Sequence, residues 1–92
     1  MTKEEWVEKL KNEGFKNVGI CPVGPNTDFG EHTHHEHTVH VIVKGELIVS
    51  ENGAVTVLKE GDRFEFPAGT THSAKSGSGD FIMVVGVKAG RS

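Results

Sequence analysis

Histidine is concentrated in one short stretch of this 92-residue chain. Of its six histidines, five fall between positions 32 and 40: His32, His34, His35, His37 and His40. Imidazole nitrogen is a general ligand for zinc, iron, copper and nickel, and about three or four protein ligands hold one such ion. A solvated loop has no use for so many imidazoles. The stretch therefore indicates a site for a divalent metal ion.

The geometry of a β-strand decides which of these histidines could bind one ion together. Residues two apart on a strand point to the same face, so His32 and His34 share a face. If the strand runs unbroken, this face also carries Glu36, Thr38 and His40. An H-x-H pair is not specific by itself, because many surface strands carry such pairs by chance. The elements and motifs around the pair must therefore show whether it belongs to a metal site.

The start of the chain predicts a short amphipathic helix over residues 3–13. Thr2 and Glu5 have the spacing of a capping box, in which each side chain satisfies a free backbone amide of the other. Gly14 is placed as the residue that ends the helix. The apolar stripe of this helix consists of Trp6, Val7 and Leu10. We expect that stripe to pack against the barrel or against a partner subunit.

From residue 15 onward, short β-branched and aromatic runs alternate with glycine-rich turns. Asn52-Gly53 is a strong hairpin signal, because both residues accept the positive φ angles of a type I′ turn. Short, evenly spaced strands are typical of an all-β sandwich or barrel. We therefore predict a single domain over residues 1–92. Its fold class is all-β, a small antiparallel β-barrel over residues 15–88 with a short N-terminal α-helix.

Composition argues against several classes of partner and location. The net charge is −3 and the basic residues are scattered, so no nucleic-acid partner is expected. No run approaches the roughly 20 apolar residues of a membrane-spanning helix, so no membrane partner is expected either. The one cysteine, Cys21, cannot form an internal disulfide, and the polar, acidic start is unlike a secretory signal. Both features predict a cytoplasmic protein.

The residues around the sixth histidine resemble a motif of the cupin superfamily, G-x5-P-x-G-x2-H-x3-N. The match runs from Gly61 through Pro67 and Gly69 to His72 at every fixed position. Only the closing asparagine differs, because Ser76 stands there. By this resemblance the chain is identified as a small stand-alone cupin, with a jelly-roll-like barrel. Its similarity to other small cupins extends over nearly the whole chain.

The first cupin motif, G-x5-H-x-H-x3,4-E-x6-G, resembles the stretch from His32 through His34 to Gly45. The resemblance implies metal ligands at His32, His34 and His72. Counting back from Gly45 places the family's glutamate ligand at Thr38, whose hydroxyl is a poor ligand for a divalent ion. The expected site therefore has three ligands from the motifs and lacks the fourth.

Two nearby residues could fill the gap left by the missing glutamate. Glu36 and His40 each lie two residues from Thr38, on the same predicted face. Either could be a fourth ligand or could orient one of the imidazoles. We favour His40, because it lies within a firmly predicted strand. The other two histidines of the stretch, His35 and His37, are expected to face solvent.

A three-histidine site is neutral, so a bound ion of Fe, Mn, Ni or Zn would keep its full charge and favour a small anionic ligand. Resemblance to three-histidine cupin-like enzymes implies oxygenase chemistry first and isomerase chemistry second. The alternative is a non-catalytic module that holds a small molecule or a metal, and a barrel without a retained role is a third. A small all-β domain with exposed strand edges is also expected to form a homodimer.

Overall fold

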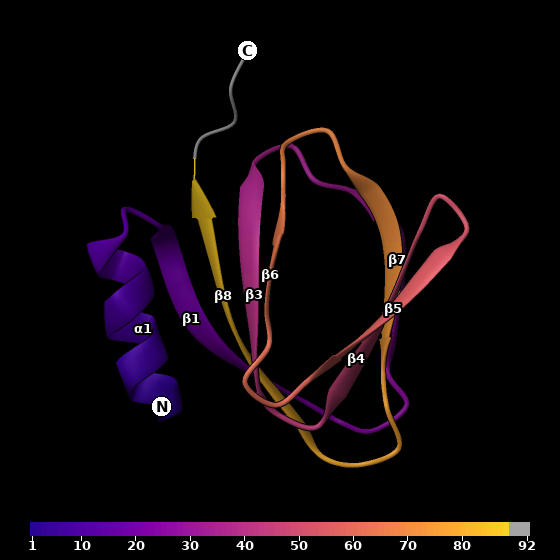
Figure 1. Ribbon diagram of the computed structural model, residues 1–92, viewed down its shortest axis with the longest axis horizontal. Helices are drawn as coiled ribbons and strands as arrows, with labels where there is room; N and C mark the ends of the chain where they lie inside the picture. The colour runs from indigo at the N-terminus through magenta and orange to yellow at the C-terminus, as the bar shows by residue number, and fades with distance from the viewer. Residues whose placement is uncertain (89–92) are drawn as a thin grey trace.

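Two four-stranded antiparallel sheets face each other, and one helix lies on the outside (Figure 1). This computed structural model describes residues 1–88, so the last four residues of the predicted domain, 89–92, lie outside the described residues. The predicted all-β class with a short N-terminal helix is confirmed. Within residues 1–88 hydrogen bonds join the strands into two separate sheets, so the barrel is open and jelly-roll-like.

The first sheet lies next to the helix and the second sheet lies on the far side (Figure 1). In spatial order, the first sheet consists of β1 (Lys16–Val23), β8 (Phe81–Lys88), β3 (His37–Lys44) and β6 (Arg63–Phe66). In the same order, the second sheet consists of β2 (Asp28–Thr33), β7 (Thr71–Ser76), β4 (Glu46–Glu51) and β5 (Ala54–Lys59). Neighbouring strands in both sheets are antiparallel, as predicted.

Helix α1 (Lys3–Asn12) begins with the predicted capping box. The Glu5 amide donates to Thr2 Oγ1 at 3.1 Å, and the Thr2 amide donates to Glu5 Oε1 at 2.7 Å. The helix ends one residue earlier than predicted, with Glu13 as its C-cap and Gly14 at a φ of 97°. No helix in the described part of the chain is both long enough and apolar enough to cross a membrane.

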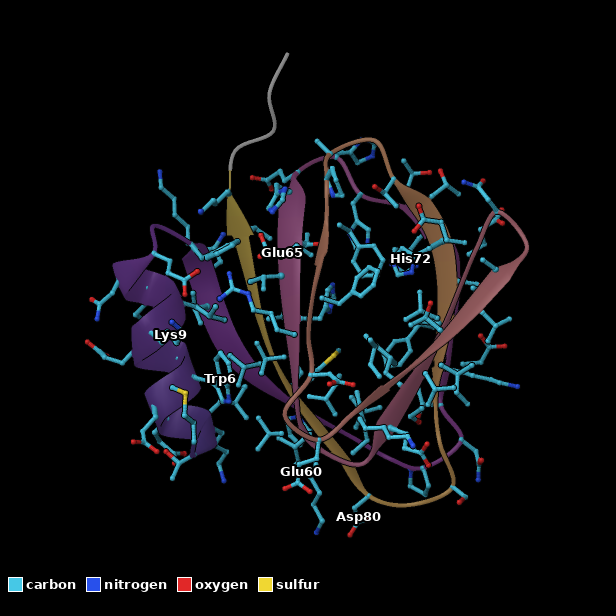
Figure 2. The ribbon with its side chains drawn as sticks, viewed as in Figure 1. Trp6, Lys9, Glu60, Glu65, His72 and Asp80 are labelled. Carbon is cyan, nitrogen blue, oxygen red and sulfur yellow. The ribbon has the colours of Figure 1, made fainter. Side chains whose placement is uncertain are left out.

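The apolar face of α1 packs on the outer side of the first sheet, as predicted. Leu10 is completely buried there, and Trp6 points from the helix towards the sheet (Figure 2). The other residues of this outer core are Val7, Phe15, Val18, Val39, Val41, Val43 and Val84. Because α1 covers one face and the second sheet covers the other, the first sheet is buried on both sides.

Strand β3 sorts its side chains between these two environments. Val39 and Val41 point outward into the core under α1, whereas Ile42 belongs to the core between the sheets. Alternation along a strand therefore turns His40 inward, on the same side as Ile42. The position of one candidate ligand thus follows from the two-sided burial of this strand.

Two turns explain glycines that the sequence singled out. Asn52 and Gly53 adopt φ angles of 51° and 79° between β4 and β5, so the predicted type I′ hairpin is confirmed. Gly45, the last glycine of the first motif, has a φ of 84° and lies against the backbone of Asp80 and Phe81. A side chain at this position would collide with the Asp80 carbonyl oxygen, so only glycine fits.

Candidate metal centre

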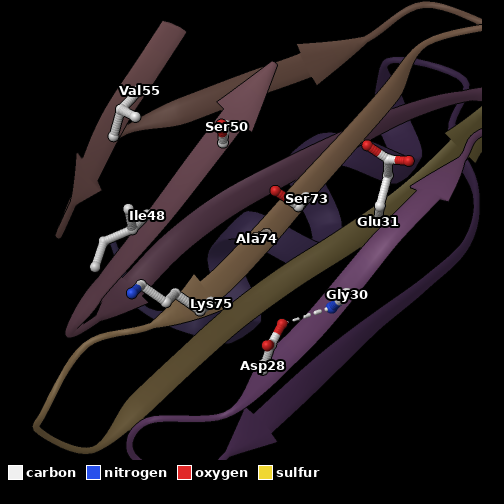
Figure 3. Close-up of a pocket in the computed structure, with 9 residues that line it drawn as sticks. All are labelled: Asp28, Gly30, Glu31, Ile48, Ser50, Val55, Ser73, Ala74 and Lys75. Atoms are coloured by element: carbon white, nitrogen blue, oxygen red, sulfur yellow. Dashed lines mark hydrogen bonds between the residues drawn. The ribbon is translucent and has the colours of Figure 1, made fainter. Parts of the chain in front are cut away.

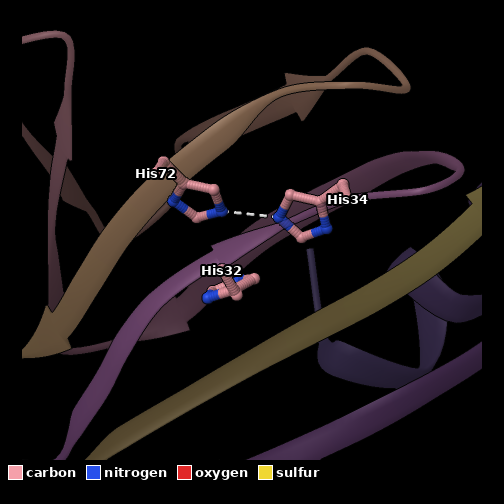
Figure 4. A group of neighbouring side chains, drawn as sticks. All are labelled: His32, His34 and His72. Atoms are coloured by element: carbon pink, nitrogen blue, oxygen red, sulfur yellow. Dashed lines mark hydrogen bonds between the residues drawn. The ribbon is translucent and has the colours of Figure 1, made fainter.

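Three histidines converge between the sheets at one end of the molecule. His32 on β2 lies directly opposite His72 on β7 in the strand register, and His34 follows the end of β2. Their ring centroids are 4.5 Å apart for His32–His72, 4.7 Å for His34–His72 and 4.8 Å for His32–His34. The nitrogen atoms that could bind an ion all lie within 4.8 Å of one another (Figure 4). The structure thus brings together the three residues that the motifs indicated.

β2 and β3 are not one continuous strand. A single face that carries Glu36, Thr38 and His40 together with His32 and His34 was expected only for an unbroken strand. β2 ends at Thr33 and β3 begins at His37, so residues 34–36 cross from the second sheet to the first. Backbone hydrogen bonds fasten this crossing to the turn before β7. The His34 amide donates to the Thr70 carbonyl at 2.9 Å, and the Gly69 amide donates to the His34 carbonyl at 2.7 Å. The second motif therefore positions His34 as well as His72.

An aromatic ring holds two of the imidazoles in parallel planes. Phe66 stacks on His72 with a centroid distance of 4.0 Å and an interplanar angle of 12°. It also lies 5.3 Å from the His34 ring, at 13°. The Nε2 atoms of His34 and His72 meet at 2.5 Å across this stack (Figure 4). The stacking of Phe66 on these histidines could not be inferred from the sequence, although its place directly before the motif's Pro67 marks it as the residue that enters the turn.

Burial favours the neutral form of two of these imidazoles, those of His34 and His72. Loss of solvent, followed by the charges of His72 and His32, lowers the pKa of His34 to about 4. Burial is also the main reason why the pKa of His72 lies below its ordinary value. A neutral imidazole offers a free lone pair to a metal, whereas a protonated one does not. The cluster is therefore ready to bind an ion at neutral pH.

The dimensions of the cluster also suit one ion. Nitrogen atoms bound to the same ion at about 2.0–2.1 Å are at most about 4.2 Å apart. The observed limit of 4.8 Å is only slightly larger, so small ring shifts would bring all three nitrogens onto one ion. The Nδ1 atom of His72 is buried without a hydrogen-bond partner among residues 1–88. Residues and spacing therefore fit a divalent metal.

The two candidates for the fourth position lie in different places. Glu36 is exposed in the crossing between β2 and β3. His40 points inward, with its ring 5.9 Å from that of His34, and burial lowers its pKa to about 4. The structure therefore brings His40 near the cluster and leaves Glu36 outside. Thr38, which occupies the position of the family's glutamate, is itself buried and its hydroxyl has no partner among the described residues.

The two histidines expected to face solvent differ from each other. His35 is exposed, in agreement with the expectation. His37 lies on the outer side of β3 but is half-buried, and its Nε2 atom is 2.7 Å from Glu65 Oε1. This hydrogen bond with a residue from the neighbouring strand β6 could not be inferred from local spacing. His37 is therefore part of a surface network and is separate from the inner cluster.

A small cavity of about 60 Å³ adjoins the cluster. It is lined by His32, His40 and His72, together with Phe29, Leu47, Ala74 and Met83. Among residues 1–88, no carboxylate or hydroxyl group contributes to this lining. A ligand in the cavity would therefore meet imidazoles on one side and apolar side chains on the other.

A larger hollow of about 550 Å³ lies over the second sheet and contains no histidine (Figure 3). Ser50, Ser73 and Lys75 line it from β4 and β7, alternating along those strands with residues of the inner core. On β2, the Gly30 amide donates to Asp28 Oδ1 at 2.8 Å at the rim of this hollow (Figure 3). The hollow is separate from the histidine cluster.

Ser76, which replaces the family's asparagine, joins the two ends of a loop. It is only 2% exposed, and its Oγ atom accepts from the Thr27 amide at 2.8 Å. The same hydroxyl donates to the Gly24 carbonyl at 2.9 Å. Ser76 therefore holds the connection between β1 and β2 and takes no part in the histidine site.

Comparison with known families settles the relationship that these features suggest. Residues 19–86 match the family of cupin domains. The chain belongs to the cupin family. The match includes the three converging histidines and Phe66. No curated protein matches this cupin.

Solved structures of other cupins have the same fold. An RmlC-like cupin from Shewanella frigidimarina is 24% identical, with a TM-score of 0.70, over 82% of this chain and 67% of that one. A Cupin 2 conserved barrel domain protein from Salinispora arenicola is 27% identical, with a TM-score of 0.68, over 76% of this chain and 60% of that one. A predicted oxalate decarboxylase from Thermotoga maritima is 20% identical, with a TM-score of 0.70, over 89% of this chain and 73% of that one. This cupin therefore spans roughly two thirds of the length of such structures.

Proposed function

We propose that this cupin binds one divalent metal ion through His32, His34 and His72 and holds a small anionic molecule beside it. The observation that carries the proposal is the convergence of three imidazoles from two neighbouring segments of the second sheet without a carboxylate among them. Imidazole sites suit zinc, iron and nickel, whereas manganese, the remaining candidate, prefers oxygen ligands. The protein's own contribution is a set of neutral nitrogen ligands that strand pairing and the Phe66 stack hold in place.

The preference for an anion follows from the charge of the site. Three neutral imidazoles leave a bound ion with its full double charge, and Thr38 supplies no compensating carboxylate. A bound ion would supply Lewis acidity and attract a negative ligand into a region of low dielectric constant. Phe29, Leu47 and Met83 keep water away from the inner side of such a ligand. Charge and shape together favour a compact carboxylate, thiolate or enolate.

Binding is the first candidate function, and oxygenase chemistry is the second. Within the described part of the chain, histidine is the one acid or base that lines the cavity, which favours holding a ligand over moving its protons. Isomerisation requires a proton to be removed and returned, so it needs a positioned base more than oxygenase chemistry does. The lining therefore places an isomerase last among these alternatives. The oxalate decarboxylase relative shares the fold, and at 20% identity its activity is not carried over.

Metal analysis of the purified protein tests the proposal directly. Protein prepared without added metal, and without a histidine tag, should contain about one equivalent of a divalent ion by plasma emission. Anomalous scattering at the metal absorption edges of a crystal should then place that ion at His32, His34 and His72. An ion bound at His35 and His37 would contradict the proposal, as would a protein that takes up no divalent ion from a metal-supplemented buffer.

A further inference from the structure

His40 is half-buried as a residue, but both of its ring nitrogens lie in the interior without a partner. Neither Nδ1 nor Nε2 has a hydrogen bond within residues 1–88, and both atoms are shielded from solvent. A neutral imidazole carries one donor and one acceptor. Buried polar groups in native proteins almost always have partners, so two unpaired nitrogens on one ring indicate a missing molecule.

His40 stands apart from the three converging histidines. Its ring centroid is 5.9 Å from that of His34, whereas the other three rings lie between 4.5 and 4.8 Å from one another. It also packs edge-on against Phe66, at 5.3 Å and 77°, where His34 and His72 stack in parallel. His40 and His72 both line the small cavity, so the space lies between the cluster and His40.

The missing molecule must be small. The cavity measures about 60 Å³, while an apolar cavity of roughly 150 Å³ holds one benzene molecule with its six carbon atoms. By that scale the space takes roughly two or three non-hydrogen atoms. The other lining residues, Phe29, Leu47, Ala74 and Met83, offer no side-chain hydrogen bond to a polar ligand. Of the described residues that line the cavity, His40 is therefore the one side chain outside the cluster that can pair with such a ligand.

We propose that His40 is a ligand-binding residue and not a fourth metal ligand: it donates an N–H to one oxygen of a compact carboxylate of formate size. This inference rests on the proposed function, because the second oxygen of the carboxylate faces the ion held by His32, His34 and His72. A carboxylate suits the site because its two oxygens can serve both sides of the cavity at once. Bulky acids are excluded by the apolar wall.

Cobalt(II)-loaded protein provides the test, because its visible absorption responds to a change at the ion. Formate is the small carboxylate whose binding is measured, and benzoate tests whether a larger carboxylate is excluded. The variant His40→Phe keeps an aromatic ring but removes both nitrogens, and His35→Phe is the matched control at an exposed position. His40→Gln also removes the ring, but its side-chain amide supplies an N–H donor at this position.

The parent and His35→Phe should bind formate with a change in the cobalt spectrum, and benzoate at least about tenfold more weakly. His40→Phe should bind cobalt within about twofold of the parent but lose about tenfold or more in formate affinity, the range for a hydrogen bond to a charged group. His40→Gln should recover part of that affinity, which a purely structural role for His40 would not produce.

Three outcomes overturn the inference, and they differ from one another. A loss of cobalt affinity in His40→Phe as large as in His72→Ala makes His40 a fourth metal ligand and leaves the proposed function standing. Equal formate affinity in parent, His40→Phe and His40→Gln shows that His40 does not touch the ligand. A parent that binds no cobalt overturns the proposed function, and this inference fails with it. Should His40→Phe not fold, the comparison of parent with His40→Gln decides by the same criteria.

Discussion

Two environments for histidine lie on opposite faces of strand β3. His40 points inward to a cavity without carboxylates, whereas His37, three residues earlier, points outward and meets Glu65 at 2.7 Å. The outer histidine also lies 6.1 Å from the ring of Phe15 under the helix. An odd separation along a strand places two side chains on opposite faces, so the backbone alone divides them. What surrounds each ring then decides its chemistry.

The inner histidines and the outer histidine have different surroundings and therefore different roles. On the inner side, burial lowers the pKa of both His34 and His40 to about 4, so their lone pairs stay available to a metal or a ligand. On the outer side, the hydrogen bond from His37 is the first cause that lowers the pKa of Glu65. A carboxylate beside a histidine builds a charged surface network, and its absence leaves neutral imidazoles for binding. The groups that surround a histidine therefore determine its role more than the number of histidines nearby does.

Loss of the inner histidines should have its main consequence for metal binding. Replacing His34 and His72 together with alanine should abolish the uptake of a divalent ion, because two of three ligands are lost. Metal should then no longer raise the melting temperature, since only binding to the folded state stabilises it. The outer double variant His35→Ala with His37→Ala should retain about one equivalent of metal by plasma emission. The reverse pattern would place the metal on the outer face.

Phe66 should have the next largest effect, because it serves the inner cluster and the core at once. It is 1% exposed, and its replacement by alanine should lower the free energy of unfolding by about 3–5 kcal/mol. Its loss should also weaken metal binding, because the stack on His34 and His72 disappears. Urea unfolding and a metal titration measure the two effects. Phe64→Ala is the control at a half-buried position, and an equal loss in both variants would contradict the special role of Phe66.

Thr38→Glu should give a smaller effect. It should strengthen the binding of the metal and weaken the binding of a small anionic ligand. A carboxylate at the position of the family's glutamate would cancel part of the ion's charge, so metal should bind about tenfold more tightly. The same carboxylate should weaken the binding of small carboxylates and thiols by competing with them. Calorimetry with metal, then with formate, measures both changes. If the variant binds formate as well as the parent does, the open-position argument fails.

Local signals predicted most of the fold. The capping box at Thr2 and Glu5, the Asn52-Gly53 hairpin and the packing of α1 are each decided by a few neighbouring residues, and all are confirmed. The second motif also indicated which distant histidine would join His32 and His34. Such signals are dependable because capping and turn chemistry need no knowledge of the rest of the chain.

Contacts between distant segments were beyond prediction. The crossing at residues 34–36, the Glu65 partner of His37 and the position of His40 across a cavity all depend on how the two sheets face each other. The bound metal, the small-molecule ligand, the cytoplasmic location, the lack of nucleic-acid or membrane partners and the homodimer stay predictions.

The exposed Val55 and Val57 on the edge strand β5 support the homodimer, and light scattering that gives the mass of one chain at micromolar concentration would contradict it.

The smallest predicted effect tests the outer network by itself. Arg63 on β6 donates two hydrogen bonds to Glu13 at the end of α1, at 2.9 and 2.6 Å, and also bonds Glu65. Glu13→Gln should lower the free energy of unfolding by only about 1 kcal/mol at pH 7, because partly exposed ion pairs contribute little. Urea unfolding measures this difference. Glu8→Gln, on the exposed face of the same helix, is the control and should change stability much less.

The pH dependence of that difference separates an ion pair from simple packing. The bond from Arg63 lowers the pKa of Glu13 from 4.5 to about 2, so the unfolded chain takes up a proton first as the pH falls. Stabilisation by the pair is therefore complete above about pH 4.5 and declines as the pH falls towards 2. Parent and Glu13→Gln should differ by a constant amount between pH 5 and about 8 and converge near pH 2. A difference that persists at pH 2 would show that Glu13 acts through packing. Metal uptake should be equal in both proteins at pH 7, because this network lies on the outer face and contributes no atom to the histidine cluster.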